Sequence, residues 1–129
     1  MDYEQIFVKK CIVKNRQDRL LYELGGKKRR DGAGRFCHDA KELLIPERIV
    51  LAGPVSESEI AHILGERAMS EECMIMAYNT DLDRCSCTAA EALRRVLGNG
   101  MAAVVMAGSF AVVETEQCCG TPMRYVLKY

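Results

Sequence analysis

The second half of the chain alternates short apolar runs with amphipathic segments. The runs 49–52, 73–78 and 101–107 contain almost only apolar residues, which is typical of strands buried on both faces. Between them, 56–67 and 88–97 place apolar residues three and four positions apart, as an amphipathic helix does. This pattern predicts the order strand, helix, strand, helix, strand.

Two further strands are expected at the end of the chain. Gly108 and Ser109 follow the third apolar run and favour a two-residue hairpin turn, in which glycine supplies a positive φ. The run 110–116 then returns as a strand. From 123 to 129 apolar residues alternate with mostly polar ones, which indicates a half-buried final strand.

The first half of the chain is mainly helical in pattern. Apolar residues at helical spacing predict a helix over 3–24, with a break near Asn15, that ends at Gly25 and Gly26. The segment 27–34 is polar and rich in glycine, so we expect a loop there. Apolar spacing resumes at Phe36 and continues until Pro46, which stops a helix.

Three predicted helices begin with residue pairs that resemble a capping box: Asp39 with Glu42, Ser56 with Glu59, and Thr88 with Glu91.

These elements predict one α/β domain over 1–129, in which 1–46 is mainly helical and basic and 47–129 has the order βαβαβββ. Strands joined through helices become parallel by right-handed crossovers, so we expect 73–78 and 101–107 to be buried parallel strands. The sheet is then mixed, with a parallel βαβαβ part followed by antiparallel strands. Two helices cover one face, and the N-terminal helices lie on the other face or at an edge. The alternative is a two-layer α+β sandwich.

Composition narrows the class of protein without identifying it. The chain has 129 residues, 49% apolar and 28% charged, which is ordinary for a globular domain and excludes disorder, collagen and coiled coil. We find neither a secretory signal nor an apolar stretch long enough to span a bilayer, so we expect no membrane association. Seven cysteines without an export signal predict free thiols and a cytoplasmic location.

Charge is distributed unevenly, although 18 basic and 18 acidic side chains cancel. Residues 1–48 carry 12 Lys and Arg against 8 Asp and Glu, and residues 49–129 carry 6 against 10. Within the basic stretch 9–35, the candidates for phosphate contacts are Lys27, Lys28, Arg29, Arg30 and Arg35. The same charges equally fit a solvated helix face or a surface for an acidic protein partner. The segment 25–35 contains no aromatic residue, whereas single-strand binders interleave aromatic rings with charge.

The segment 79–88 is the second candidate site, because it combines acidic, basic and thiol groups. Asp81 and Asp83 supply oxygen ligands of the kind that a hard cation prefers, and Arg84 lies beside them. Cys85 and Cys87 precede a predicted helix, whose N-terminus favours a thiolate. The alternative is a turn capped by aspartate, with two small residues packed at its end.

Cofactor and metal motifs are not found in the sequence. The chain has none of the common nucleotide-binding or hydrolase motifs. Its close cysteine and histidine pairs lack the two-residue gap of zinc knuckles: Cys37 with His38, Cys85 with Cys87, and Cys118 with Cys119. We therefore expect no zinc and no cofactor.

Three functional hypotheses follow. The first is a small cytosolic binding or regulatory protein that acts by protein-surface recognition without turnover, with a protein partner or a second copy of itself. The second is a nucleic-acid-binding module that uses 9–35. The third is an enzyme with a site in 79–88, in which Cys85 or Cys87 is the nucleophile.

Overall fold

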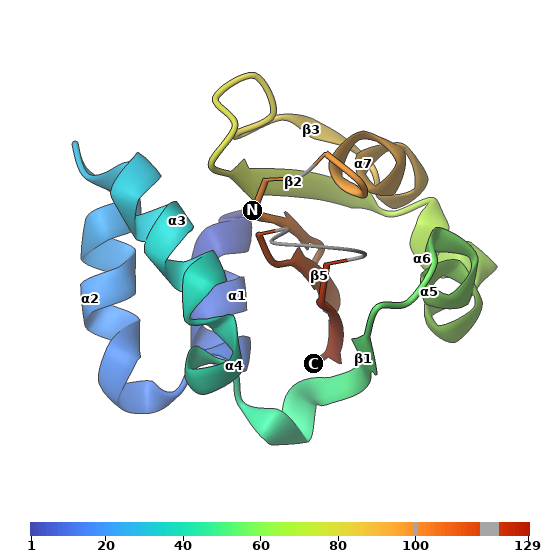
Figure 1. Cartoon of the computed structure of the whole chain (residues 1–129), viewed down its shortest axis with the longest axis horizontal. Helices are drawn as coiled ribbons and strands as arrows, with labels where there is room; N and C mark the ends of the chain where they lie inside the picture. Colours follow the sequence, from blue (N-terminus) through green and yellow to red (C-terminus); the bar gives the residue numbers. More distant parts are fainter. Residues whose placement is uncertain (100, 117–121) are drawn as a thin grey trace.

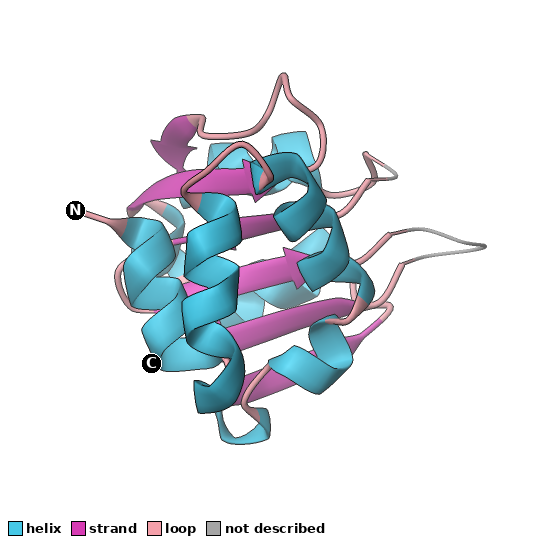
Figure 2. Ribbon diagram, turned by 90° about the vertical axis from the view of Figure 1, so that its left-hand side faces the viewer, coloured by secondary structure: helices cyan, strands magenta, loops and turns pink. Residues whose placement is uncertain are grey.

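The computed structural model, which describes residues 1–99, 101–116 and 122–129, contains a six-stranded sheet between two layers of helices (Figures 1 and 2). The strands are β1 (Ile49–Gly53), β2 (Glu72–Ala77), β3 (Ser86–Thr88), β4 (Ala103–Met106), β5 (Phe110–Glu114) and β6 (Arg124–Lys128). They lie side by side in the order β1-β6-β5-β4-β2-β3. Every neighbouring pair is antiparallel.

The N-terminal helices cover one face of the sheet, and the later helices cover the other (Figure 1). The first layer contains α1 (Tyr3–Cys11), α2 (Lys14–Leu24), α3 (Arg29–His38) and α4 (Ala40–Leu43). A short 3-10 helix, η1 (Pro46–Arg48), leads into β1. The second layer contains α5 (Glu57–Leu64), α6 (Glu66–Met69) and α7 (Ala89–Val96). The α/β class, with helices preceding the sheet, is therefore confirmed, in three layers instead of the alternative two.

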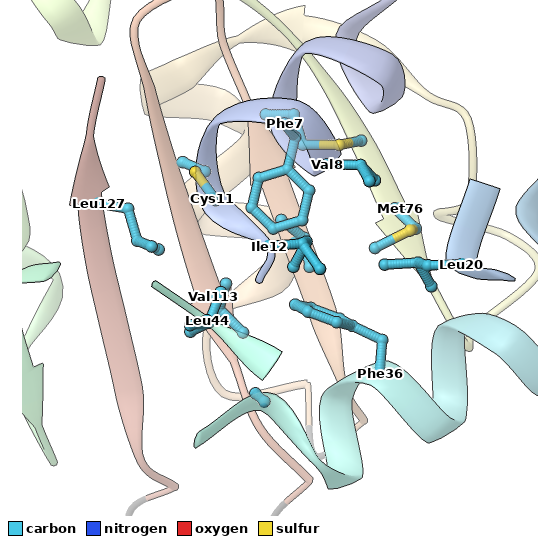
Figure 3. Close-up of a cluster of buried hydrophobic side chains, with 14 of the residues drawn as sticks. Phe7, Val8, Cys11, Ile12, Leu20, Phe36, Leu44, Met76, Val113 and Leu127 are labelled. Carbon is cyan, nitrogen blue, oxygen red and sulfur yellow. The ribbon is translucent and has the colours of Figure 1, made fainter. Parts of the chain in front are cut away.

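Alternating side chains of the central strands build a hydrophobic core on each face. Met76, Val113 and Leu127 pack against the first helical layer, where the rings of Phe7 and Phe36 meet edge to face with centroids 5.7 Å apart (Figure 3). Residues of opposite parity, such as Ile75, Val105 and Val112, pack against α5 and α7. Both faces of β4 and β5 are therefore buried, which explains their unbroken apolar sequences.

The predicted parallel pairing of 73–78 with 101–107 is wrong, because β2 and β4 are antiparallel neighbours. The chain turns back after β2 and forms β3 at the end of the candidate segment 79–88, for which no strand was predicted. Since β3 and β4 both pair antiparallel with β2, they run in the same direction, and α7 connects them across β2. The expected parallel βαβαβ part of the sheet is therefore also wrong, since all described strand pairs are antiparallel.

Burial of the first and last strands also differs from the prediction. The final strand was expected to be half-buried, but Arg124, Tyr125, Val126 and Leu127 are all buried. The reason is the sheet order, since β6 lies between β1 and β5 with helices on both sides. By contrast, β1 lies at the sheet edge, and its residues alternate between partly buried and exposed.

Two of the three predicted helix N-caps are present in the structure. Ser56 and Glu59 form the expected capping box, and Thr88 accepts a hydrogen bond from the Glu91 N–H. Asp39 makes no side-chain cap, and α3 begins at Arg29 within the predicted loop.

The hairpin between β4 and β5 is confirmed. Its Gly108, however, is not among the described glycines with positive φ, which are Gly53, Gly65 and Gly98. None of the helices in the described residues combines the length and apolar character that crossing a bilayer requires.

Candidate functional site

Asp83, a candidate cation ligand, is bound to the protein's own basic stretch. Its carboxylate accepts hydrogen bonds from Arg29 at 2.7 and 3.0 Å and from the Ala77 N–H at 3.0 Å. Arg29 also donates to Glu4 and to the Leu24 carbonyl, and its side chain is only 10% exposed. Arg29 therefore joins α1, α3 and the turn after β2, and it does not contribute to an exposed phosphate-binding surface.

The charges of this network stabilise one another. Burial alone raises the pKa of Asp83, but the hydrogen bonds from Arg29 and the Ala77 N–H outweigh burial, so the pKa lies below its ordinary value. Burial likewise lowers the pKa of Arg29, and the hydrogen bonds to Glu4 and Asp83 more than reverse this effect, so its pKa is raised. Arg29 and Asp83 are therefore both charged at neutral pH.

The other residues of the 79–88 site lie along the turn and the start of β3. Asp81 is exposed, and its N–H donates to the Asn79 side chain at 2.9 Å, as in an Asx turn. Arg84 has a positive φ of 67° and is exposed, while its N–H donates to the Ile75 carbonyl at 2.7 Å. This part of the site is an exposed turn held by backbone hydrogen bonds.

Cys85 and Cys87 are partly buried against the core beneath α7. The Cys85 thiol donates to the Asp81 carbonyl at 3.4 Å, and Arg95 of α7 lies 3.9 Å from the Cys85 Sγ. Burial and the nearby Glu91 raise the pKa of Cys87 despite the presence of Arg95. This direction is opposite to that of an activated nucleophile.

No metal centre is found in the described part of the chain. Among 1–99, 101–116 and 122–129, no three His, Cys, Asp or Glu side chains are arranged to hold a metal ion. The pair Cys118 and Cys119 and the side chain of Cys37 lie outside the described residues.

The remaining basic candidates are distributed over α3 and the turn before it. The Arg30 guanidinium lies over the Tyr78 ring, 4.2 Å from its centroid, and donates to the Tyr78 carbonyl. Arg35 donates to Glu23 at 2.7 Å. Lys27 and Lys28 are fully on the surface. Of the five candidates, the two lysines are therefore those whose charges are most open to a partner.

Folding leaves a basic surface on the first helical layer. Residues 1–48 expose ten Lys and Arg side chains but only five Asp and Glu side chains. Glu4, Glu23 and Asp39 are withdrawn into the interior, wholly or in part. The opposite layer belongs to the half of the chain with the acidic excess. The exposed basic excess is therefore a feature of the first helical layer.

A groove on the basic layer combines charge with an exposed aromatic ring. Its volume is about 510 Å³, and it lies at the end of α2. Tyr22 has 80% of its surface exposed, although an aromatic side chain of this kind is usually at least partly buried. The groove is lined by Leu21, Tyr22, Gly25, Gly26, Lys27 and Lys28. We refer to it as the Tyr22 groove.

Two other hollows flank α3. One, of about 140 Å³, lies over the buried Glu23, which binds Arg19 at 3.0 Å and Arg35 at 2.7 Å. The other, of about 330 Å³, lies beside Tyr78 and includes His38 and Glu116. Among the described residues that line these two hollows, no nucleophile lies within hydrogen-bond distance of a base.

Two features were not predicted from the sequence: the exposed ring of Tyr22 and the buried ion pair between Glu114 and Arg124. Tyr22 lies three residues before the segment 25–35 that was searched for aromatic rings, and its place on the polar side of α2 was a usable signal. Glu114, only 1% exposed, binds Arg124 at 2.8 Å. The two residues are cross-strand partners in the antiparallel register of β5 and β6, which the structure shows.

Comparison with known proteins adds no relative, since no family model, no curated protein and no solved structure matches this chain.

Proposed function

We propose that this is a cytosolic binding protein that recognises an acidic protein partner through its basic helical layer, without turnover. The observation that carries the proposal is the Tyr22 groove, in which an exposed tyrosine lies beside Lys27 and Lys28. The free thiols of Cys11, Cys73, Cys85 and Cys87 support the cytosolic location.

The groove has the composition of a protein-binding hot spot. Tyrosine anchors are enriched at the centres of protein interfaces, where a large ring is buried at low entropic cost. Lysines at the rim raise the association rate of an acidic partner and exclude basic ones. The backbones of Gly25 and Gly26 carry no side chains that would obstruct a bound segment.

The distribution of charge favours a different protein over a second copy of this chain at the groove. A two-fold dimer places the same patch of both copies in contact. Such a contact at the Tyr22 groove would bring Lys27 and Lys28 close to their copies, within a layer that exposes ten basic side chains and only five acidic ones. Like charges across an interface are unfavourable, so we propose a heteromeric partner.

Single-stranded nucleic acid is the second candidate, because the exposed ring of Tyr22 lies beside the segment 25–35, which contains no aromatic residue of its own. Bases stack on exposed rings while lysines contact phosphates. A complex of this kind weakens steeply with salt.

The test compares two probes of equal charge: an acidic peptide pool containing Asp, Glu and Leu, and a single-stranded oligonucleotide. Fluorescence anisotropy at physiological salt gives the affinity of each. We expect the peptides to bind more tightly than the oligonucleotide, and the variants Tyr22→Ala and Lys27→Glu/Lys28→Glu to weaken peptide binding by about tenfold or more. Lys41→Glu, which changes an exposed lysine of α4, is the control and leaves binding within about twofold. Tighter oligonucleotide binding would support the second candidate, and binding unaffected by the Tyr22 groove variants would refute both.

A further inference from the structure

Cys73 and Cys87 face each other across the antiparallel pair formed by β2 and β3. Both side chains belong to the face of the sheet that α7 covers. Cys73 is fully buried, whereas Cys87 is partly exposed on the edge strand. The two thiols therefore form a vicinal pair with one buried and one accessible member.

The hydrogen-bond pattern identifies the kind of cross-strand position. The Ile75 N–H donates to the Cys85 carbonyl, and the Ala89 N–H donates to the Glu71 carbonyl. Cys73 and Cys87 lie midway between these two pairs, so they too occupy a hydrogen-bonded position, where Cα atoms are about 5.5 Å apart. This separation lies within the range of about 4.4–6.8 Å that a disulfide bridges.

The same position makes such a bond easy to reduce. Side chains diverge more at hydrogen-bonded positions than at the others, so their Cβ atoms lie towards the upper end of about 4.5–5.5 Å. Disulfides prefer Cβ separations of about 3.5–4.5 Å, so a bridge here is strained. Strained bridges have higher reduction potentials and form the labile, regulatory class.

Arg95 and Glu91, both on α7, lie beside the accessible side of the pair. Arg95 lies 3.9 Å from the Cys85 Sγ, and Cys85 is two residues from Cys87 on the same face of the strand. A guanidinium at this place attracts the anionic carboxylates of small peptide thiols and disulfides such as glutathione. It also partly offsets the burial and the charge of Glu91 that raise the pKa of Cys87.

We propose that Cys73 and Cys87 are a reversible redox pair, oxidised to a cross-strand disulfide by a low-molecular-weight disulfide. The Cys87 thiolate attacks one sulfur of the small disulfide, whose S–S bond breaks and releases one thiolate that takes up a proton. The Cys73 thiolate then attacks the Cys87 sulfur of this mixed disulfide and releases the second small thiol. The two protein thiols lose two electrons and two protons, and the small disulfide is reduced to two thiols.

A disulfide between Cys73 and Cys87 would restrict the motion of the segment 73–88, which contacts the first helical layer through Asp83 and leads into α7 of the second layer. It closes a loop from 73 to 87, which contains Asp83, the partner of Arg29. It also fixes the residue before Thr88, the N-cap of α7. This inference stands independently of the proposed partner at the Tyr22 groove.

Peptide mapping of the wild-type chain tests the pair without any substitution. The protein is equilibrated in buffers of defined oxidised to reduced glutathione ratio, trapped with an alkylating agent and analysed by mass spectrometry. We expect a disulfide between Cys73 and Cys87 that disappears on reduction. Its formation should accelerate steadily from about pH 7 to pH 9 without levelling off, because thiolates are the attacking species and burial raises the pKa of Cys87 and, to about 12, that of Cys73. Absence of this disulfide in the strongly oxidising buffer, or a bond between Cys85 and Cys87 in its place, would overturn the proposal.

Two variants separate the steps. In Cys73→Ser we expect glutathione to remain attached to Cys87, because the resolving thiol is gone. The matched control is Cys11→Ser, which changes a fully buried cysteine on the other face and leaves the disulfide yield unchanged. Failure of a variant to fold leaves the wild-type mapping decisive.

Discussion

The Arg29 guanidinium donates two hydrogen bonds to the Asp83 carboxylate, although the two residues are 54 positions apart in the sequence. The same guanidinium binds Glu4 of α1. Arg29 comes from the basic stretch 9–35 and Asp83 from the turn after β2, so two segments far apart in the sequence neutralise each other's charge inside the fold. Their contact fastens the first helical layer to the turn between β2 and β3.

Replacing Arg29 by alanine should destabilise the protein severely. The change leaves Asp83 and Glu4 with no guanidinium partner at partly buried positions, and breaking a buried pair in this way costs about 3–5 kcal/mol. Urea unfolding followed by circular dichroism measures the loss. Arg30→Ala is the control, because the exposed Arg30 guanidinium lies over the Tyr78 ring, and this change should cost about 1 kcal/mol or less. Equal losses for the two variants would show that the Arg29 network has no special weight.

Asp83 should make stability depend on pH in the acid range. Its pKa is lower in the folded chain than in the unfolded chain, so the unfolded state takes up its proton first as pH falls. The stabilisation is therefore present above the unfolded value of about 3.9 and is lost as pH falls through the lower folded value. Asp83→Asn should be less stable than wild type at pH 7, and the two unfolding free energies should converge below about pH 4. Parallel curves from pH 7 to pH 3 would contradict this assignment.

The sequence predicted most elements of the sheet because their signals are local. The apolar runs that became β1, β2, β4 and β5 were recognised, as was the turn between β4 and β5. The strand β3 was missed, because its three residues Ser86, Cys87 and Thr88 have neither length nor an apolar pattern. That one omission reversed the predicted direction of β2 relative to β4.

The candidate site was harder to predict, because charge alone does not show which residues are withdrawn. Arg29 and Arg30 are adjacent and chemically identical, yet the first is buried in ion pairs and the second lies over a tyrosine ring. Only the three-dimensional position of Glu4 and Asp83 distinguishes them. Glycine patterns were misleading for a related reason. Gly32 and Gly34 suggested a loop, but they lie in α3 and permit its close approach to Glu23 of α2 and to Tyr78.

Gly32 should be intolerant of a side chain. A Cβ atom at this position would lie 2.8 Å from the Glu23 Cβ and 3.0 Å from its carboxylate, so α2 and α3 would have to separate. We expect Gly32→Ala to cost about 1–3 kcal/mol, as overpacking does. Gly26→Ala is the matched control, since its nearest atom lies at 3.5 Å, and alanine there should be neutral or slightly stabilising. Thermal unfolding of both variants measures the difference, and a stable Gly32→Ala would mean that the two helices yield easily.

Glu114 and Arg124 should prove strongly coupled. Glu114 is 1% exposed and accepts hydrogen bonds from Arg124 at 2.8 Å and from the Gly98 N–H, while Arg124 also donates to the Val55 carbonyl. Either Glu114→Leu or Arg124→Leu leaves one charge buried without its partner, so each should cost about 3–5 kcal/mol. The double variant leaves no unpaired charge and should cost clearly less than the sum of the two single changes. Urea unfolding of all four proteins gives the coupling energy. Simple additivity would indicate that water solvates the surviving charge, so the pair would then be a peripheral contact and not a fixed link between β5, β6 and the chain after β1.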